Sequence, residues 1–123
     1  MARVLVDTSI WIDHFRQGNP RLQKLLVDGE ILCHEFVIGE LACGNLKNRD
    51  EILSLLQKLP KSKIANHEET LKLIESNRLM GKGIGWIDAH LIASALLTQA
   101  KLWTADKKLK KVSTELELAI GFK

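Results

Sequence analysis

Hydrophobic residues at the start of the chain form a short run without alternating polar positions. The stretch RVLVDTSIW (residues 3–11) contains β-branched and aliphatic residues up to Val6 and then the carboxylate of Asp7. Such a run is typical of a strand buried on both faces of a parallel sheet. Because chemistry gathers at the carboxyl ends of parallel strands, Asp7 stands where a functional side chain is expected.

Beyond this strand, the pattern alternates between helical spacing and short apolar runs. It predicts helices over residues 9–16, 20–28, 36–46, 50–59, 67–80 and 86–99, and a short basic helix or turn over 107–112. It predicts strands over 31–34 and 101–104, a very short one at 64–65 and an edge strand over 117–120. Thr8 or Ser9 is the expected N-cap of the first helix. Strands that alternate with helices predict an α/β three-layer sandwich with a central parallel sheet flanked by helices.

Composition places the chain among ordinary globular proteins. Its 123 residues, 46% hydrophobic and 27% charged, predict a single domain spanning 1–123 with a real core. No apolar run reaches the length of a membrane helix, and the N-terminus lacks a signal-peptide pattern, so we expect a cytoplasmic protein. The net charge of +3 permits a polyanionic partner without demanding one.

Two acids interrupt apolar helical segments. Glu40 has Val37, Cys43 and Gly44 at helical spacing, and Asp88 has similarly apolar neighbours. A carboxylate on a core-facing stripe costs several kcal/mol unless a cation or a set of donors receives it. No Lys or Arg occupies the matching positions on either predicted helix. Both acids are therefore expected on apolar, core-facing stripes.

Asp7 and Asp106 follow predicted strands, so the fold can bring four acids together. For Asp88 and Asp106 taken singly, a helix-terminus or capping role explains the acid equally well. Four converging carboxylates, however, could not all ionise without a compensating cation. Oxygen ligands alone suit Mg²⁺ or Mn²⁺ and not zinc.

Four segments in register carry a family resemblance: VDTSIWID (6–13), VIGEL (37–41), GWIDAHL (85–91) and LWTAD (102–106). Together they resemble the motifs of PIN-domain ribonucleases, above all the VapC toxins of bacterial toxin–antitoxin pairs. The resemblance covers essentially the whole chain. It implies a Mg²⁺- or Mn²⁺-dependent endoribonuclease with a central parallel sheet, a frequent homodimer, an RNA substrate and a cognate antitoxin that blocks the site.

The same resemblance implies roles for individual residues. Asp7 and Asp88 are expected as direct metal ligands, Asp106 as a ligand directly or through water, and Glu40 as a ligand or as the group that orients the nucleophilic water. Ser9, Thr8 and Thr104 could hold the carboxylates by hydrogen bonds, although plain helix capping explains Thr8 as well. Four lysines after Asp106 either contact RNA phosphates or form a solvated surface: Lys107, Lys108, Lys110 and Lys111.

Three other functions compete with a toxin nuclease. An RNA-maturation nuclease of the same family would have the same acids and no antitoxin. A receiver-like phosphoacceptor domain has similar length and α/β order, but needs adjacent acids after its first strand and a late lysine, which this chain lacks. A non-catalytic binding module of the same fold would be expected to have lost one or more of the four acids.

Overall fold

The central sheet contains three parallel strands. The structure is a computed structural model that describes residues 3–122. The strands are β1 (Val4–Val6), β2 (Ile31–Leu32) and β3 (Lys101–Trp103), in the order β2-β1-β3. Val4 of the central strand lies opposite Ile31 on one side and Lys101 on the other. The predicted parallel sheet with flanking helices is therefore confirmed.

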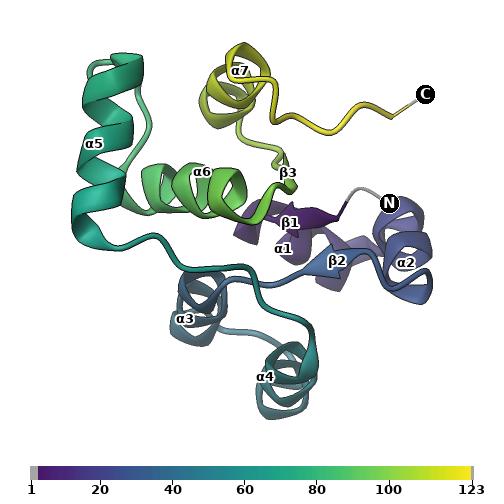
Figure 1. The fold of residues 1–123 in the computed structure, drawn as a ribbon. Helices are drawn as coiled ribbons and strands as arrows, with labels where there is room; N and C mark the ends of the chain where they lie inside the picture. The colour runs from purple at the N-terminus through teal and green to yellow at the C-terminus, as the bar shows by residue number, and fades with distance from the viewer. Residues whose placement is uncertain (1–2, 123) are drawn as a thin grey trace.

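Seven helices surround this sheet in the described part of the chain. They are α1 (Thr8–Gln17), α2 (Pro20–Val27), α3 (Glu35–Cys43), α4 (Arg49–Lys58), α5 (His67–Asn77), α6 (Trp86–Thr98) and α7 (Lys107–Glu115). In Figure 1, α7 lies above the sheet, α3 and α4 lie below it, and α5 packs against α6 at a steep angle on the left. The sheet is thus covered from both sides, as its uniformly apolar strands require.

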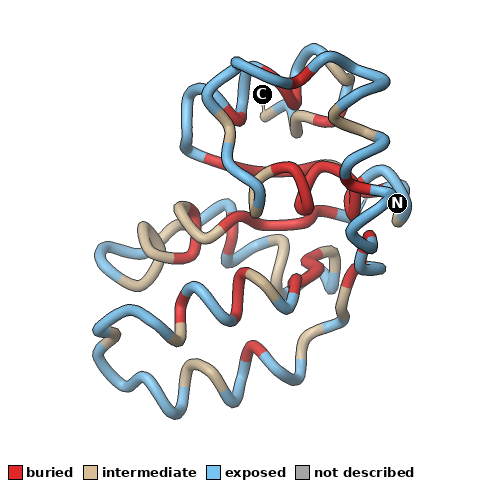
Figure 2. Tube along the Cα trace, turned by 90° about the vertical axis from the view of Figure 1, so that its left-hand side faces the viewer, coloured by how far each residue is buried: buried red, intermediate tan, exposed pale blue. Residues whose placement is uncertain are grey.

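The core is built on β1 and α6. Val4, Leu5 and Val6 are all almost completely buried, which explains why β1 shows no polar alternation. Every residue of α6 from Ala89 to Ala95 is buried as well. Figure 2 shows this burial as a central band, with helices at the periphery alternating between buried and exposed positions. The carboxyl ends of the strands are consequently positioned by the most rigid part of the molecule.

Two predicted strands are wrong. Residues 64–65 form no strand, because the segment that pairs beside β2 comes earlier, in a single bridge between Cys33 and Lys61. Residues 117–120 contribute only one parallel bridge, between Leu102 and Ala119. Glu117 has a left-handed backbone with φ of 60°, which ends any extended conformation at that point.

The ends of two helices also differ from expectation. The N-cap of α1 is Asp7, and not Thr8 or Ser9, so both hydroxyl residues already lie within the helix. The basic helix α7 continues beyond 112 to Glu115, because Leu109, Val112 and Ser113 bury one face of it against the core. Because Thr8 and Ser9 do not cap α1, their hydroxyl groups are available for other contacts.

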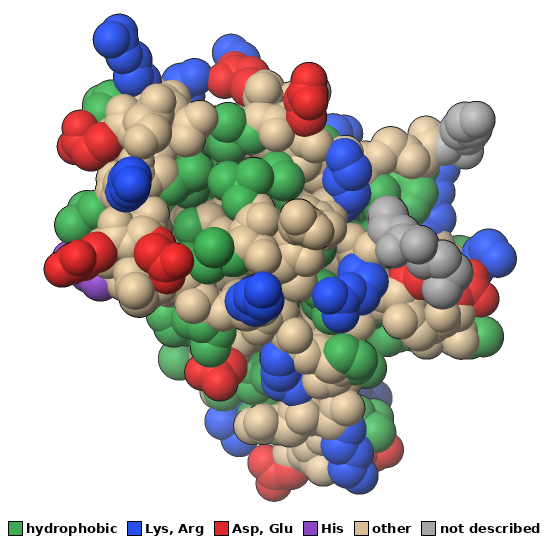
Figure 3. All heavy atoms as spheres, in the orientation of Figure 1, with side chains coloured by type: hydrophobic (Ala, Val, Ile, Leu, Met, Phe, Trp, Pro, Cys, Tyr) green, Lys and Arg blue, Asp and Glu red, His purple; other side chains and the backbone are tan. Residues whose placement is uncertain are grey.

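Basic side chains do not form a continuous patch on the face drawn in Figure 3. On the side drawn in Figure 3, lysines and arginines are scattered among acids, and hydrophobic side chains gather between α5 and α7. Across residues 3–122, none of the helices has both the length and the apolar character needed to cross a membrane.

Candidate active site

Asp7 is the buried acid of the site, with 7% of its surface exposed. Its Oδ2 accepts hydrogen bonds from Thr104 Oγ1 at 2.7 Å and from Ser9 Oγ at 2.9 Å. Each hydroxyl has a single proton, so both are spent on the carboxylate. The 3.4 Å contact between the two hydroxyl oxygens is therefore an approach of two donors to a common acceptor. This geometry holds one carboxylate oxygen in place.

The two hydroxyls also join the ends of β1 and β3. Ser9 Oγ accepts from the backbone N–H of Ala105 at 3.0 Å, and Thr104 Oγ1 accepts from that of Asp106 at 3.1 Å. The roles predicted for Ser9 and Thr104 thus correspond to observed contacts with the acid at the end of β1. Residues almost a hundred positions apart become one hydrogen-bonded unit.

Asp106 is fixed as the N-cap of α7. Its Oδ1 accepts from the backbone N–H groups of Lys108 and Leu109, both at 2.9 Å. The capping role considered for this acid is therefore real. It leaves the second carboxylate oxygen without a hydrogen bond to any described residue, so capping and ligand binding do not compete for the same atom.

Asp88 is half-buried near the start of α6, where its Oδ2 accepts from the backbone N–H of Gly85 at 3.0 Å. Burial is the main cause that raises the pKa of this carboxyl, and the charges of Asp7 and Asp106 raise it further. The hydrogen bond from Gly85 acts in the opposite direction. The electrostatic coupling places three of the four predicted acids in one neighbourhood.

Glu40 differs from the prediction, because its side chain is exposed and does not face the core. The inward face of α3 is formed by Val37, Ile38 and Leu41, whereas Cys43 and Gly44 are exposed. In a helix that is apolar nearly all round, neighbours at helical spacing do not reveal which face is buried. Glu40 is joined to the site through Thr8, whose Oγ1 donates to Glu40 Oε1 at 2.7 Å. Thr8 therefore contacts an acid and does not cap α1.

The four lysines of α7 are all exposed, and one of them has a distinct position. The side chain of Lys108 crosses Gly83, where an added Cβ would lie 2.5 Å from Lys108 Cδ. Gly83 has φ of 80°, so both its backbone and its lack of a side chain are used. A salt bridge of 2.8 Å between Lys82 and Glu115 ties the same loop to α7. Lys108 thereby lies over the loop that leads into Asp88.

The acids converge without forming a finished metal site. Within residues 3–122, no three His, Cys, Asp or Glu side chains already have the spacing of a metal-ligand set. The donor chemistry nevertheless fits a hard cation, since Asp7, Asp88 and Asp106 each use only one carboxylate oxygen for their internal hydrogen bonds. None of these three forms a salt bridge to a described lysine or arginine. A cation held by the free carboxylate oxygens would offset the repulsion among these like charges.

Sequence reasoning missed a cavity that adjoins Glu40. Its lining includes Arg16 and the loop over residues 44–48. The polar residues of the whole lining therefore lie far apart in the sequence. No local motif identifies such a cavity, because its walls come from three separate helices and a loop.

Comparison with known proteins identifies the class of this protein. Residues 4–115 match the family described as PIN domain. Because this match covers most of the chain, the protein belongs to the PIN-domain family. Relatives named Ribonuclease VapC32, from two strains of Mycobacterium tuberculosis, are 47% identical over 119 residues, which is 96% of this chain and 96% of theirs.

Solved structures share the fold at low sequence identity. The structure of FitAB bound to an IR36 DNA fragment matches with a TM-score of 0.63 and 16% identity, over 96% of this chain and 93% of that one. PAE2754 from Pyrobaculum aerophilum matches with a TM-score of 0.60 and 16% identity, over 94% and 90% of the two chains. The resemblance drawn from the four motifs is thus confirmed at the level of family and fold.

Proposed function

We propose that this protein is a metal-dependent endoribonuclease that acts as the toxin of a toxin–antitoxin pair. The observation that carries the proposal is the grouping of Asp7 and Asp106, which follow β1 and β3, with Asp88 near the start of α6. Glu40 is attached to this group through Thr8. The 47% identity to proteins named Ribonuclease VapC32 supports RNA as the substrate.

Each acid has a role suited to its setting. Asp7 and Asp88 would hold the cation directly, and Asp106 would hold it directly or through a water molecule. Glu40, exposed and attached by a single hydrogen bond from Thr8, would bind the cation or orient the attacking water. When bound, Mg²⁺ or Mn²⁺ supplies a lowered pKa for water and neutralises charge on the leaving oxygen. Ser9 and Thr104 position Asp7. The exposed lysines of α7 would contact RNA phosphates: Lys107, Lys108, Lys110 and Lys111.

Metal dependence is tested with the purified protein and single-stranded RNA. We expect EDTA to abolish cleavage and either Mg²⁺ or Mn²⁺, added in excess, to restore it. The Asp7→Asn variant, purified in the same way, controls for contaminating nucleases. Cleavage that continues undiminished in chelator, and that is absent from the variant preparation, would contradict a metal mechanism while leaving the nuclease in place.

Toxicity is a separate part of the proposal. We expect expression of the protein alone to stop growth, and co-expression with an antitoxin encoded beside it to restore growth. The cleavage-deficient Asp7→Asn variant should be harmless in both conditions. We also expect a homodimer. Sedimentation equilibrium or light scattering of the purified protein would measure its molar mass in solution.

An RNA-maturation nuclease remains the second candidate, because the same acids would serve it. Normal growth despite abundant soluble and RNA-cleaving protein would favour that function over a toxin. The receiver-like alternative is disfavoured by the family match over residues 4–115.

A further inference from the structure

A cavity of about 470 Å³ lies between α1, α3 and the start of α4, and Glu40 forms part of its wall. Glu40 is also hydrogen-bonded to Thr8, which precedes Ser9 and follows Asp7 in the chain, so the cavity adjoins the part of the acidic site that Glu40 provides. Its volume is within the range of about 300–1,000 Å³ that small-ligand sites occupy. Under the proposed function, a ligand in this cavity would therefore lie beside Glu40.

Two cations in the cavity wall are available to a ligand. Arg16, near the end of α1, and Lys47, in the loop before α4, are both exposed and line the cavity. Neither forms a salt bridge with any residue between 3 and 122. Unpaired cations beside a phosphodiester-cleaving centre favour an anionic ligand.

Asn48 has an unusual conformation for its position. It is the N-cap residue of α4, yet its backbone is left-handed, with φ of 57° and ψ of 38°, and its side chain makes no capping hydrogen bond. Asparagine at an N-cap normally stabilises the helix through that bond. Asn48 instead forms part of the cavity wall, together with Asn45. Side-chain amides present a donor and an acceptor, which is the pattern that reads the edge of a nucleobase.

The remaining wall is apolar and includes an aromatic ring. Phe15 and Ile12 of α1 face Leu41 of α3 and Ile52 of α4 across the cavity. Nε of Arg49 donates to the carbonyl of Ala42 at 3.0 Å, which holds the loop between α3 and α4 closed. An aromatic and aliphatic wall flanked by amides and cations is the combination that single-stranded RNA sites use for base, edge and phosphate.

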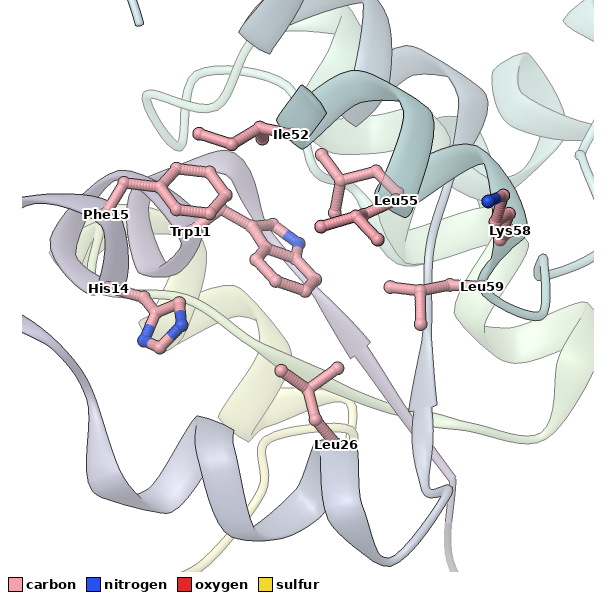
Figure 4. Close-up of a pocket in the computed structure, with 9 residues that line it drawn as sticks. Trp11, His14, Phe15, Leu26, Ile52, Leu55, Lys58 and Leu59 are labelled. Atoms are coloured by element: carbon pink, nitrogen blue, oxygen red, sulfur yellow. The ribbon is translucent and has the colours of Figure 1, made fainter. Parts of the chain in front are cut away.

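An adjacent cavity differs from this one in its chemistry. It measures about 360 Å³ and lies on the other side of Phe15 and Ile52, where Trp11 and Phe15 of α1 face Ile52 and Leu55 of α4 (Figure 4). Lys58 is its only charged residue apart from the titratable His14, and its other lining residues are hydrophobic. The contrast favours RNA over a protein segment for the cavity beside Glu40.

We propose that the cavity beside Glu40 is a subsite for one nucleotide of single-stranded RNA, next to the cleaved bond. The base packs against Phe15, the amides of Asn45 and Asn48 contact its edge, and Arg16 and Lys47 contact flanking phosphates. The proposal rests on the proposed nuclease function, since it places the subsite by its distance along the substrate from the acids.

The phosphate contacts are tested by binding without cleavage. In the Asp7→Asn background, the affinity for a labelled 12-nucleotide single-stranded RNA of random sequence is measured over a range of salt concentrations. Each of Arg16→Ala and Lys47→Ala should make the slope of log affinity against log salt shallower by about 0.7. Lys72→Ala is the matched control, because Lys72 is an exposed lysine lining another cavity, of about 440 Å³, formed by α5 and α6, and should leave the slope unchanged.

The base contact is tested in the active enzyme by sequencing the ends of cleaved random RNA. Asn48→Gly removes the amide and suits the left-handed backbone, so it should weaken the base preference at one position beside the cut by about fivefold or more. Gln99→Gly is the control, because Gln99 is likewise left-handed with φ of 59°, but lies at the C-terminal end of α6.

The outcomes separate this subsite from the nuclease function. Normal RNA cleavage with unchanged salt slopes and unchanged base preference would overturn the subsite and leave the nuclease standing. Loss of antitoxin binding by the Arg16 and Lys47 variants, with RNA binding intact, would overturn it in favour of a peptide site. If the wild-type protein cleaves no RNA with either metal, the nuclease function fails, and unchanged salt slopes would then overturn the subsite as well.

Discussion

The two halves of the acidic site differ in how firmly their carboxylates are held. The strand half consists of Asp7 and Asp106, each of which accepts two hydrogen bonds on a single oxygen. The helix half consists of Glu40 and Asp88, each of which accepts one. Asp7 is buried, whereas Glu40 is exposed.

This difference indicates a division of labour. The donors around the strand half are already in place, so no reorganisation is needed when charge gathers there. The helix half is held by fewer hydrogen bonds, so under the proposed function Glu40 and Asp88 would be free to adjust when a cation and an RNA phosphate bind.

The largest effect that we expect is the loss of RNA cleavage when the acids themselves are replaced. We predict that Asp7→Asn lowers RNA cleavage by about 1,000-fold, and Asp88→Asn by a similar factor, because a ligand in the transition state is lost. Glu40→Gln should cost only about 10- to 100-fold, since its carboxylate is the least fixed. Cleavage rates at saturating Mg²⁺ or Mn²⁺ measure all three.

Stability provides the control for that prediction. Without metal, Asp7→Asn should stay level with the wild type or gain a fraction to a few kcal/mol in free energy of unfolding, because a buried charge is removed. Variants that are destabilised by several kcal/mol but still cleave RNA would show that these acids serve the scaffold.

The next effect concerns how firmly α3, which carries Glu40, is seated. His34 is fully buried at the start of α3, where its Nδ1 accepts from the backbone N–H of Phe36 at 3.0 Å and its Nε2 lies 3.0 Å from Ser94 Oγ. Burial is the main cause that lowers the pKa of His34 to about 4, and the nearby His90 lowers it further. The folded protein therefore keeps this imidazole neutral well below the pH at which the unfolded chain protonates it.

The sign of the pH dependence follows from this shift. Stability from His34 is complete above pH 6.5 and is lost as the pH falls toward 4, and about 2 kcal/mol should disappear between pH 7 and pH 5. His34→Asn retains an N-cap acceptor and removes the titration, so its stability should fall less over that interval. Urea unfolding in EDTA at the two pH values measures the difference, and equal losses in both proteins would contradict the assignment.

The smallest effects that we expect come from replacing the threonines that contact the acids, Thr104 and Thr8. Thr104→Val keeps the shape but removes the donor to Asp7 and the acceptor for the N–H of Asp106, so it should cost about 1–2 kcal/mol of stability and at least tenfold in cleavage. Thr8→Val removes one exposed contact to Glu40 and should change stability by less than about 0.5 kcal/mol. Paired unfolding and cleavage measurements test both variants, and equal losses from the two would mean that the halves are equally rigid.

Local patterns predicted most of the scaffold because each followed from a short-range physical rule. The unbroken apolar run of β1 predicted burial on both faces. Helical spacing predicted a helix from residue 20, and α2 does begin at Pro20, where the side chain of the N-cap residue Asn19 accepts from the N–H of Leu22. The same rules failed at residues 117–120, where a left-handed Glu117 prevents a strand that the apolar pattern favours. Strand pairing depends on a distant partner, which local spacing does not contain.

The four motifs are contiguous and in register, so the amino-acid sequence alone was enough to predict the family to which the chain belongs. It also supplied the four acids that we propose as the site. Only the tertiary structure decided that Thr104 and Ser9 share one oxygen of Asp7, that Glu40 is exposed, and that Asn48 lines a cavity without capping its helix. The physical reason is that burial and hydrogen bonding between residues 9 and 104 depend on how the chain closes in space. Spacing along one helix or strand does not specify that closure.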